Sequence, residues 1–319
     1  MAAIGSMIPS SALAEPRAHR SREAIRNPRI LVGGGVVGLM LLFCVGSLPW
    51  TLRQDRSLYY NAQQGSAVRR PPGFGTVAGW FGTDALGNSL LSRCLVGGVI
   101  SLTIGLAAAA ISVVLGVAVG LVAGYRGGWV DGLLMRIVDV LYGLPYLLLV
   151  ILFKIALERP LSRALHSEPA GSLVVLFLAI GLVSWLTMAR VVRGQVLLLR
   201  GLPFVEAARA TGVTEWGIFI RHLLPNLIGP ITVYATLTVP QAILQESLLS
   251  FLGVGIQAPL PTWGSLASDG LMPALNPIHS LWWLLLFPCT LLAITLLSLN
   301  FLGDGLRDVF DPKREGAKI

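Results

Sequence analysis

The feature that most constrains this chain is a series of long apolar stretches. Several of them reach the roughly 20 residues that a helix needs to cross a bilayer. The 319 residues are 54% hydrophobic and 13% charged, whereas soluble domains carry about a quarter charged residues. We therefore predict an all-α polytopic membrane protein with six transmembrane helices. The predicted spans are 30–50, 95–123, 133–157, 172–190, 227–249 and 282–302.

The distribution of positive charge predicts how these spans are oriented. With the N-terminus placed in the cytoplasm, 16 of the 24 Lys and Arg residues fall on cytoplasmic segments and seven on extracytoplasmic ones. Such an excess is typical of cytoplasmic loops, so both termini are predicted to be cytoplasmic. The net charge of +8 then needs no nucleic-acid partner. The predicted segments are a disordered cytoplasmic tail (1–29), a first helix (30–50), an extracytoplasmic segment (51–94), a core membrane domain (95–302) containing a cytoplasmic loop (191–226), and a cytoplasmic tail (303–319).

Small residues recur at a regular interval in the second span. Gly116, Gly120 and Gly124 are four residues apart. In lipid, this spacing lets two helix backbones approach closely. The pattern predicts a tightly packed multi-helix bundle.

The sequence contains no motif for catalysis or for nucleotide binding. None of the three lysines, Lys154, Lys313 and Lys318, follows a glycine, so no Walker-type phosphate loop is present. The zinc-protease motif and the serine nucleophile elbow are also missing. We predict no catalytic residue, no metal site and no cofactor bound by this chain.

The loop 191–226 stands out because it is polar and carries helix signals between two apolar spans. Pro203 suits the first turn of a helix, Phe204–Ala210 continues it, and Gly212 supplies the permissive backbone that ends it. Thr214 and Glu215 suit the start of a second helix.

That second helix is expected to run to about Leu224, before Pro225. The loop is therefore predicted to form a helix–turn–helix on the cytoplasmic face. From composition alone it could be an amphipathic connector on the membrane surface or a docking element for a soluble partner.

The order of residues in this loop favours docking. Glu206, Ala207 and Ala208 are followed after three residues by Gly212, and after nine more by a segment that ends in Leu224 and Pro225. This spacing resembles the EAA signature of ABC-importer permeases. His222 stands where the general pattern has Ile, which is similar to the peptide-importer branch.

Other segments are similar to the same branch, the dipeptide/oligopeptide (peptide/nickel) permease family, and to its C-type subunit. FGTDALGNSLLSR (81–93) resembles a block of that family, with Asn88 and Ser89 in place of Arg and Asp. The further matching segments are RIVDVLYGLPYLLL (136–149), ESLLSFLGVG (246–255) and FLGDGLRDVFDP (301–312). The resemblance covers about residues 80–312.

The resemblance implies the type I importer fold, with five core helices and an additional first helix, in a prokaryotic cell membrane. It also implies alternating access, a second homologous permease, two ATPase subunits that bind ATP and Mg²⁺, and an extracytoplasmic binding protein. The residues expected to couple this chain to the ATPases are Phe204, Glu206, Ala207, Ala208, Ala210, Gly212 and Pro225.

Two acidic residues are candidates for the translocation path. Glu246 falls near the outer end of the fifth span, where a carboxylate is costly unless it faces water or a partner. It could hold the bundle together or line the path. Asp269 lies in an outer loop and could face a delivered substrate. Arg136 and Asp139 are three residues apart and are expected to form a local ion pair.

The implied substrates are di- or oligopeptides, and nickel chelates, glutathione and haem remain alternatives. A secondary transporter or channel is a more distant alternative, because such proteins more often show inverted repeats and charges at mid-membrane depth. A polytopic membrane enzyme would need clustered His, Asp or Ser residues at that depth, and the sequence shows no such cluster.

Overall fold

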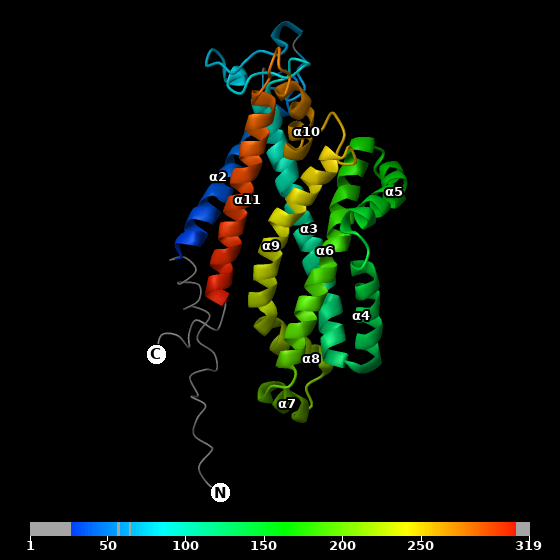
Figure 1. Cartoon of the computed structure of the whole chain (residues 1–319). Coiled ribbons are helices and arrows are strands. Elements are labelled where there is room, and N and C mark those ends of the chain that lie inside the picture. The colour runs from blue at the N-terminus through cyan, green and yellow to red at the C-terminus, as the bar shows by residue number, and fades with distance from the viewer. Residues whose placement is uncertain (1–26, 56–57, 64, 311–319) are drawn as a thin grey trace.

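The computed structural model describes residues 27–55, 58–63 and 65–310, and the described part is a helical bundle (Figure 1). The predicted N-terminal tail therefore lies outside the described residues except for residues 27–29. The same holds for residues 311–319 of the predicted C-terminal tail. Residues 303–310 of that tail are helical, since the last helix continues to Phe310.

Five helices are long and apolar enough to cross a membrane, and they overlap five of the six predicted spans. Each buries part of its surface against its neighbours and leaves the rest apolar and exposed, as lipid-facing helices do. They are α2 (Pro28–Thr51), α3 (Leu90–Arg126), α6 (Glu168–Leu199), α9 (Leu224–Phe251, preceded without a gap by residues 215–223) and α11 (Trp283–Phe310).

The prediction of one continuous helix over 133–157 is wrong. The region forms α4 (Gly128–Tyr142) and α5 (Tyr146–Leu165), which are bent by 97° relative to each other. Pro145 stands directly before α5 with an extended ψ of 125°. A proline has no N–H to donate, and it disfavours helical geometry at the residue before it. Because the residues on both sides of the break are apolar, a hydropathy pattern does not reveal it. The two helices count as a sixth span only if they are taken together.

The helices pack around the pair α3 and α6, which make the most extensive contact in the bundle. On one side α9 and then α11 and α2 follow, and on the other side lie α4 and α5 (Figure 1). Helix α10 (Trp263–Ala274) lies at one end of the bundle against α9 and α11. The short helix α7 (Pro203–Ala210) lies at the opposite end (Figure 1).

The glycines of α3 account for its close approach to α6. A Cβ atom on Gly116 would lie 2.5 Å from Cβ of Met188, and one on Gly120 would lie 2.6 Å from the carbonyl oxygen of Ala189. A Cβ atom on Gly124 would meet Cβ of Val196 at 2.8 Å. The packing role predicted for these glycines is confirmed.

The segment between α2 and α3 is held by polar contacts at the α10 end. The carboxylate of Asp84 accepts hydrogen bonds from the backbone and side-chain amides of Asn88 and from Nη1 of Arg93, at 2.7 to 2.9 Å. Ser89 caps the first turn of α3, so this helix begins at Leu90, five residues before the predicted start. The two residues that depart from the family pattern, Asn88 and Ser89, thus have structural contacts of their own.

Helix α5 is attached to the loop after α9 by a buried lysine. Nζ of Lys154 donates to the carbonyl oxygens of Val254 and Gly255, the latter at 3.0 Å. A buried ammonium is costly unless its donors are satisfied, and two carbonyls and the nearby carboxylate of Glu158 (3.9 Å) supply the partners. The bent pair α4–α5 is thereby fixed at its α5 end.

We expect Gly120→Ala to destabilise the chain, because the new methyl group would force α3 away from α6. Overpacking of this kind costs about 1–3 kcal/mol. Gly132→Ala on α4 is the matched control, since a Cβ atom there meets nothing within 4 Å. Unfolding of the purified variants in detergent measures the difference, and equal stability of the two would contradict close α3–α6 packing.

Candidate functional site

Helix α7 is attached to the bundle by one face and free on the other. Its side chains Val205 and Ala208 are buried, while Glu206, Ala207 and Ala210 are exposed. Phe204 is half-buried and packs with the same apolar cluster as Val205. Pro203 occupies the first turn, as the sequence predicted. Helix α7 lies at the end of the bundle (Figure 1), and its exposed residues include one carboxylate, that of Glu206.

The buried face of α7 packs against the ends of the long helices. Val205 and Ala208 belong to one cluster with Tyr125 of α3, Val196 of α6 and Leu227 of α9. The guanidinium of Arg209 lies 5.2 Å from the ring centre of Tyr125, and its Nε is 3.4 Å from the hydroxyl. A displacement of α7 would therefore displace α3, α6 and α9 as well.

Gly212 ends α7 in a conformation that requires glycine. Its φ is +80°, in the left-handed region that other residues rarely adopt. The N–H of Gly212 donates to the carbonyl of Arg209, and the N–H of Val213 donates to that of Ala208. These two bonds form a Schellman motif. The predicted role of Gly212 as the end of the helix is confirmed, and so is Thr214 as the cap of the next one.

The expectation that the second helix ends before Pro225 is wrong. Helix α8 (Glu215–Ile218) continues through a π-helical turn (Phe219–Leu223) directly into α9, with Pro225 in the first turn of α9. Pro225 has no N–H to donate to the preceding turn, and a widened turn accommodates its ring. No flexible linker separates α8 from the membrane helix.

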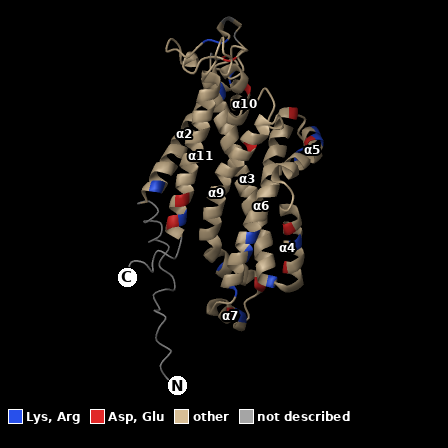
Figure 2. Cartoon of the chain, in the orientation of Figure 1, with Lys and Arg blue, Asp and Glu red and all other residues tan. Residues whose placement is uncertain are grey.

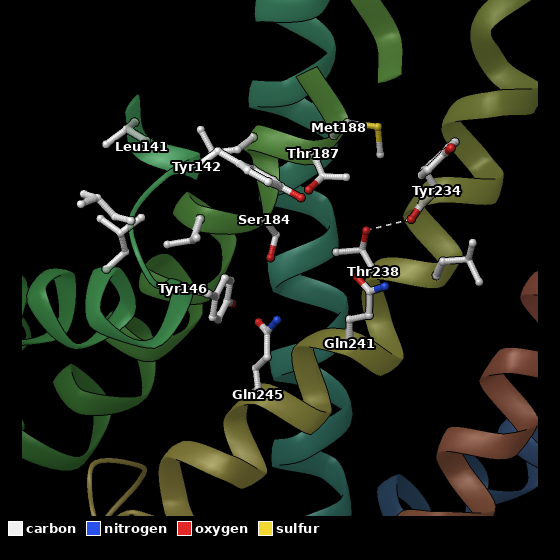
Figure 3. A pocket seen from close by; sticks show the side chains of 15 residues that line it. Leu141, Tyr142, Tyr146, Ser184, Thr187, Met188, Tyr234, Thr238, Gln241 and Gln245 are labelled. Atoms are coloured by element: carbon white, nitrogen blue, oxygen red, sulfur yellow. Dashed lines mark hydrogen bonds between the residues drawn. The ribbon is translucent and has the colours of Figure 1, made fainter. Parts of the chain in front are cut away.

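A cavity of about 450 Å³ lies beside the break between α4 and α5 (Figure 3). The break contributes Tyr142 and Tyr146, and α6 and α9 complete the wall. None of the lining residues is charged. The lining residues are Leu141, Tyr142, Leu144, Tyr146, Leu149, Val183, Ser184, Leu186, Thr187, Met188, Tyr234, Leu237, Thr238, Gln241 and Gln245.

The polar groups of this cavity form a stripe along α9. Tyr234, Thr238, Gln241 and Gln245 follow at intervals of four, three and four residues, which places them on one face of a helix. In Figure 3 the side chain of Gln245 lies beside Tyr146, whereas Tyr234 lies at the far end of the stripe and its ring points away from Tyr146. The sequence interpretation considered charges and missed this stripe, although polar residues at helical spacing in an apolar span were a signal for it.

Two ion pairs connect α4 to α6 next to the cavity. Arg193 binds Asp131 with two hydrogen bonds of 2.5 and 2.7 Å. Arg190 binds Asp139 at 2.8 Å and lies over the ring of Tyr142 at 3.9 Å. The expected ion pair between Arg136 and Asp139 does not form, because Asp139 pairs with Arg190 of α6 instead. In Figure 2, acidic and basic residues lie along α4 and the neighbouring part of α6, on the half of the bundle that carries α7.

Glu246 lies between α9 and α10 and does not line the cavity. Its side chain is fully buried, and Oε1 accepts hydrogen bonds from the hydroxyls of Ser250 (2.7 Å) and Thr262 (2.8 Å). Thr262 also caps α10. In this structure Glu246 therefore connects the start of α10 to α9, which corresponds to the first of the two roles considered for it.

Asp269 lies on α10 in a smaller cavity of about 200 Å³ at the opposite end from α7. Asp84 and Arg93 share that cavity. Burial raises the pKa of Asp269, and the positive charge of Arg93 opposes the shift. The two candidates for a translocation path, Glu246 and Asp269, are thus separate from each other and from the larger cavity.

The chain is similar to membrane components of transport systems. Residues 116–316 match the family described as binding-protein-dependent transport system inner membrane component. The oligopeptide transport system permease protein OppC of Escherichia coli (strain K12) is 49% identical over 234 residues, which cover 73% of this chain and 72% of that protein. The dipeptide transport system permease protein DppC of Bacillus subtilis (strain 168) is 47% identical over 234 residues, covering 73% and 68%.

A solved structure has the same fold. The MetNI methionine ABC transporter in an inward-facing conformation contains a chain that matches with a TM-score of 0.52 and 19% identity, over 67% of this chain and 94% of that one. At this identity the likeness concerns the fold alone. It agrees with the importer fold that the sequence resemblance implied.

Proposed function

The chain belongs to the family of binding-protein-dependent transport system inner membrane components, and from this premise we propose that it is the permease subunit of an ATP-driven peptide importer. The observation that carries the substrate class is the similarity, at 47 to 49% identity, to permeases named for oligopeptides and dipeptides. That similarity covers nearly three quarters of the chain. The cavity beside α4 and α5 supports a path for a polar, flexible substrate.

We propose that α7 docks into an ATPase subunit. Its exposed residues include two alanines, Ala207 and Ala210, beside one carboxylate, Glu206; Pro203 and Arg209 are exposed as well. Alanines keep the helix thin enough for a groove, and a carboxylate can form a charge-assisted hydrogen bond with Arg or Lys in the partner. Pro203 and Gly212 fix both ends of the helix, so the docking face has a single orientation.

Movement of the ATPase reaches the membrane through rigid contacts. The cluster around Val205 and Ala208 joins α7 to α3, α6 and α9, and α8 continues into α9 without a linker. ATP and Mg²⁺ would be bound by the ATPase partner, and hydrolysis of the ATP would supply the energy. In this chain, α7 would occupy different positions in the inward-open and outward-open states. The coupling free energy between ATPase and permease then equals the difference in contact free energy between these two states.

The complete importer would contain a second homologous permease, two ATPase subunits and an extracytoplasmic binding protein. ATPases operate in the cytoplasm, so the α7 end of the bundle would be cytoplasmic and the α10 end extracytoplasmic. With this orientation the basic residues Arg126, Arg200 and Arg209 lie on the cytoplasmic side, in agreement with the positive-inside rule.

The docking proposal predicts that Glu206→Lys uncouples the importer. A lysine placed against a cation of the ATPase costs several kcal/mol at a desolvated contact, so subunit association should weaken by about 100-fold or more. Glu168→Lys, the same charge change on an exposed residue at the other end of the bundle, is the matched control. Pull-down of the ATPase subunits, together with peptide-stimulated ATP hydrolysis in vesicles containing the binding protein, measures the effect.

Gly212→Val should give the same phenotype for a different reason. A β-branched residue at φ +80° is strained, so the turn would change conformation and reorient α7. Gly201→Val is the matched control, because Gly201 has no positive φ and a Cβ atom there meets nothing within 4 Å. Membrane insertion should stay normal in both variants. Unchanged coupling in Glu206→Lys and Gly212→Val would show that α7 is a passive connector.

The proposed orientation predicts opposite labelling of two exposed positions. In a variant without the three native cysteines, Ile278→Cys should react with an impermeant thiol reagent added to intact cells, since Ile278 is 80% exposed at the α10 end. Ala210→Cys should react only in inverted vesicles stripped of ATPase subunits. The reverse pattern would place α7 outside the cell and exclude its docking to an ATPase.

A further inference from the structure

The cavity beside the α4–α5 break contains buried polar groups that have no partner within the described residues. The side-chain oxygen Oε1 of Gln245 and the hydroxyl of Tyr146 are both buried and accept or donate no hydrogen bond there. Tyr146 lies beside Ser184, whose hydroxyl donates its one proton to the carbonyl of Ile180 at 2.8 Å and therefore has none to give to Tyr146. Buried polar atoms are nearly always paired, so unpaired ones call for an explanation. Both atoms belong to the wall of one cavity.

The wall of this cavity combines hydrogen-bonding groups with a lack of charge. Its polar side chains are amides, hydroxyls and phenols, and no Lys, Arg, Asp or Glu lines it. Arg190, which lies over the ring of the lining residue Tyr142, is bound to Asp139 at 2.8 Å. At about 450 Å³ the cavity lies within the range of roughly 300–1,000 Å³ that is usual for small-molecule sites.

The glutamine spacing matches the repeat of an extended peptide. Gln241 and Gln245 are four residues apart on α9, which is about 6 Å along a helix axis. Alternate residues of an extended chain are separated by about 6.6 Å. A glutamine amide both donates and accepts hydrogen bonds, so each can pair with one peptide unit.

We propose that this cavity is a binding subsite for the main chain of the peptide in transit, with Gln245 and Tyr146 as its central contacts and Gln241 one step along. The proposal rests on the function proposed above. The main-chain amide is the group that all peptides share, whereas their side chains differ in charge. A neutral wall that carries amide groups can bind the main-chain amide and presents no electrostatic barrier to charged side chains. Hydrogen-bonding groups and electrostatic barriers along a pore decide which solutes pass through it.

If the cavity binds the peptide main chain, a charge introduced at Gln245 should make the transport rate depend on the charge of the peptide. The wild-type protein should show no such dependence. The test uses the complete importer in vesicles, with the binding protein saturated by one of three labelled tetrapeptides: tetra-alanine, or tetra-alanine with one residue replaced by Lys or by Glu. At saturation the transport rate no longer depends on the affinity of the binding protein. Wild-type rates for the three peptides should agree within about threefold.

Gln245→Glu, assayed at pH 8 to keep the carboxylate ionised, should slow the Glu-containing peptide relative to the Lys-containing one by about tenfold or more, because like charges at a partly desolvated contact repel. Gln245→Leu should slow all three peptides by the same factor, roughly three- to tenfold, through the loss of one hydrogen bond. Gln257→Glu is the matched control. Gln257 is exposed in the loop after α9 and does not line this cavity.

The outcomes separate the two proposals. If the wild-type importer moves none of the three peptides, the proposed function is wrong. If it moves them and Gln245→Glu changes the three rates equally, or changes none, the subsite is wrong and the function stands. A charge preference in Gln245→Glu that Gln257→Glu does not share supports the subsite.

Discussion

The structure depends on the rule that every backbone polar group inside a bilayer must be paired within the protein. Helices meet this rule by themselves, which is why the described part of the chain crosses as helices. Irregular backbone at membrane depth is tolerated only where it is buried in protein or lines a cavity. The break at residues 143–145 between α4 and α5 lies beside the cavity of about 450 Å³ lined by Tyr142 and Tyr146, which is where the rule permits it.

The break has consequences for both neighbouring helices. On the α4 side of the break, Asp131 and Asp139 pair with Arg193 and Arg190 of α6. On the α5 side, Lys154 donates hydrogen bonds to the backbone after α9. The bent pair is thus held by polar contacts at two points while its middle lines the cavity.

The cavity and the α7 docking face share the same two long helices. Helix α6 carries Ser184 and Thr187 and ends just before α7, and α9 carries Gln241 and Gln245 and continues directly from α8. No flexible segment intervenes between α8 and α9. A rigid displacement of α7 would therefore move both polar walls of the cavity together, and this provides a physical path from the proposed ATPase contact to the proposed peptide contact.

Local features of this chain could be predicted from its sequence, whereas those that depend on tertiary contacts could not. Gly212, Pro203 and Thr214 act through backbone geometry within a few residues, and the structure confirms each one. The partner of Asp139 lies 51 residues away on another helix, and Glu246 meets Thr262 across a turn. Neither contact has a local signature. Pro145 was a sequence signal for the α4–α5 break, but the continuous apolar pattern on both sides of it led to the prediction of one helix over 133–157.

The orientation of the spans and the role of α7 in coupling stay predictions, because both depend on partners outside this chain. The polar stripe on α9 is different, since four residues at helical spacing encode it directly. An interpretation that searches apolar spans for charged residues alone overlooks a path built from amides and hydroxyls. For a transporter of chemically varied substrates, neutral polar side chains at helical spacing are the more informative signal.

The central claim, that this chain is the permease of a peptide importer, is tested most directly by uptake in living cells. The measurement is accumulation of radiolabelled tetra-alanine in a strain whose other peptide permeases are absent, with this chain present, deleted and restored. Deletion should abolish uptake, and restoring the chain should recover it. Uptake that persists in the deletion strain, with transport of an unrelated solute lost instead, would contradict the account.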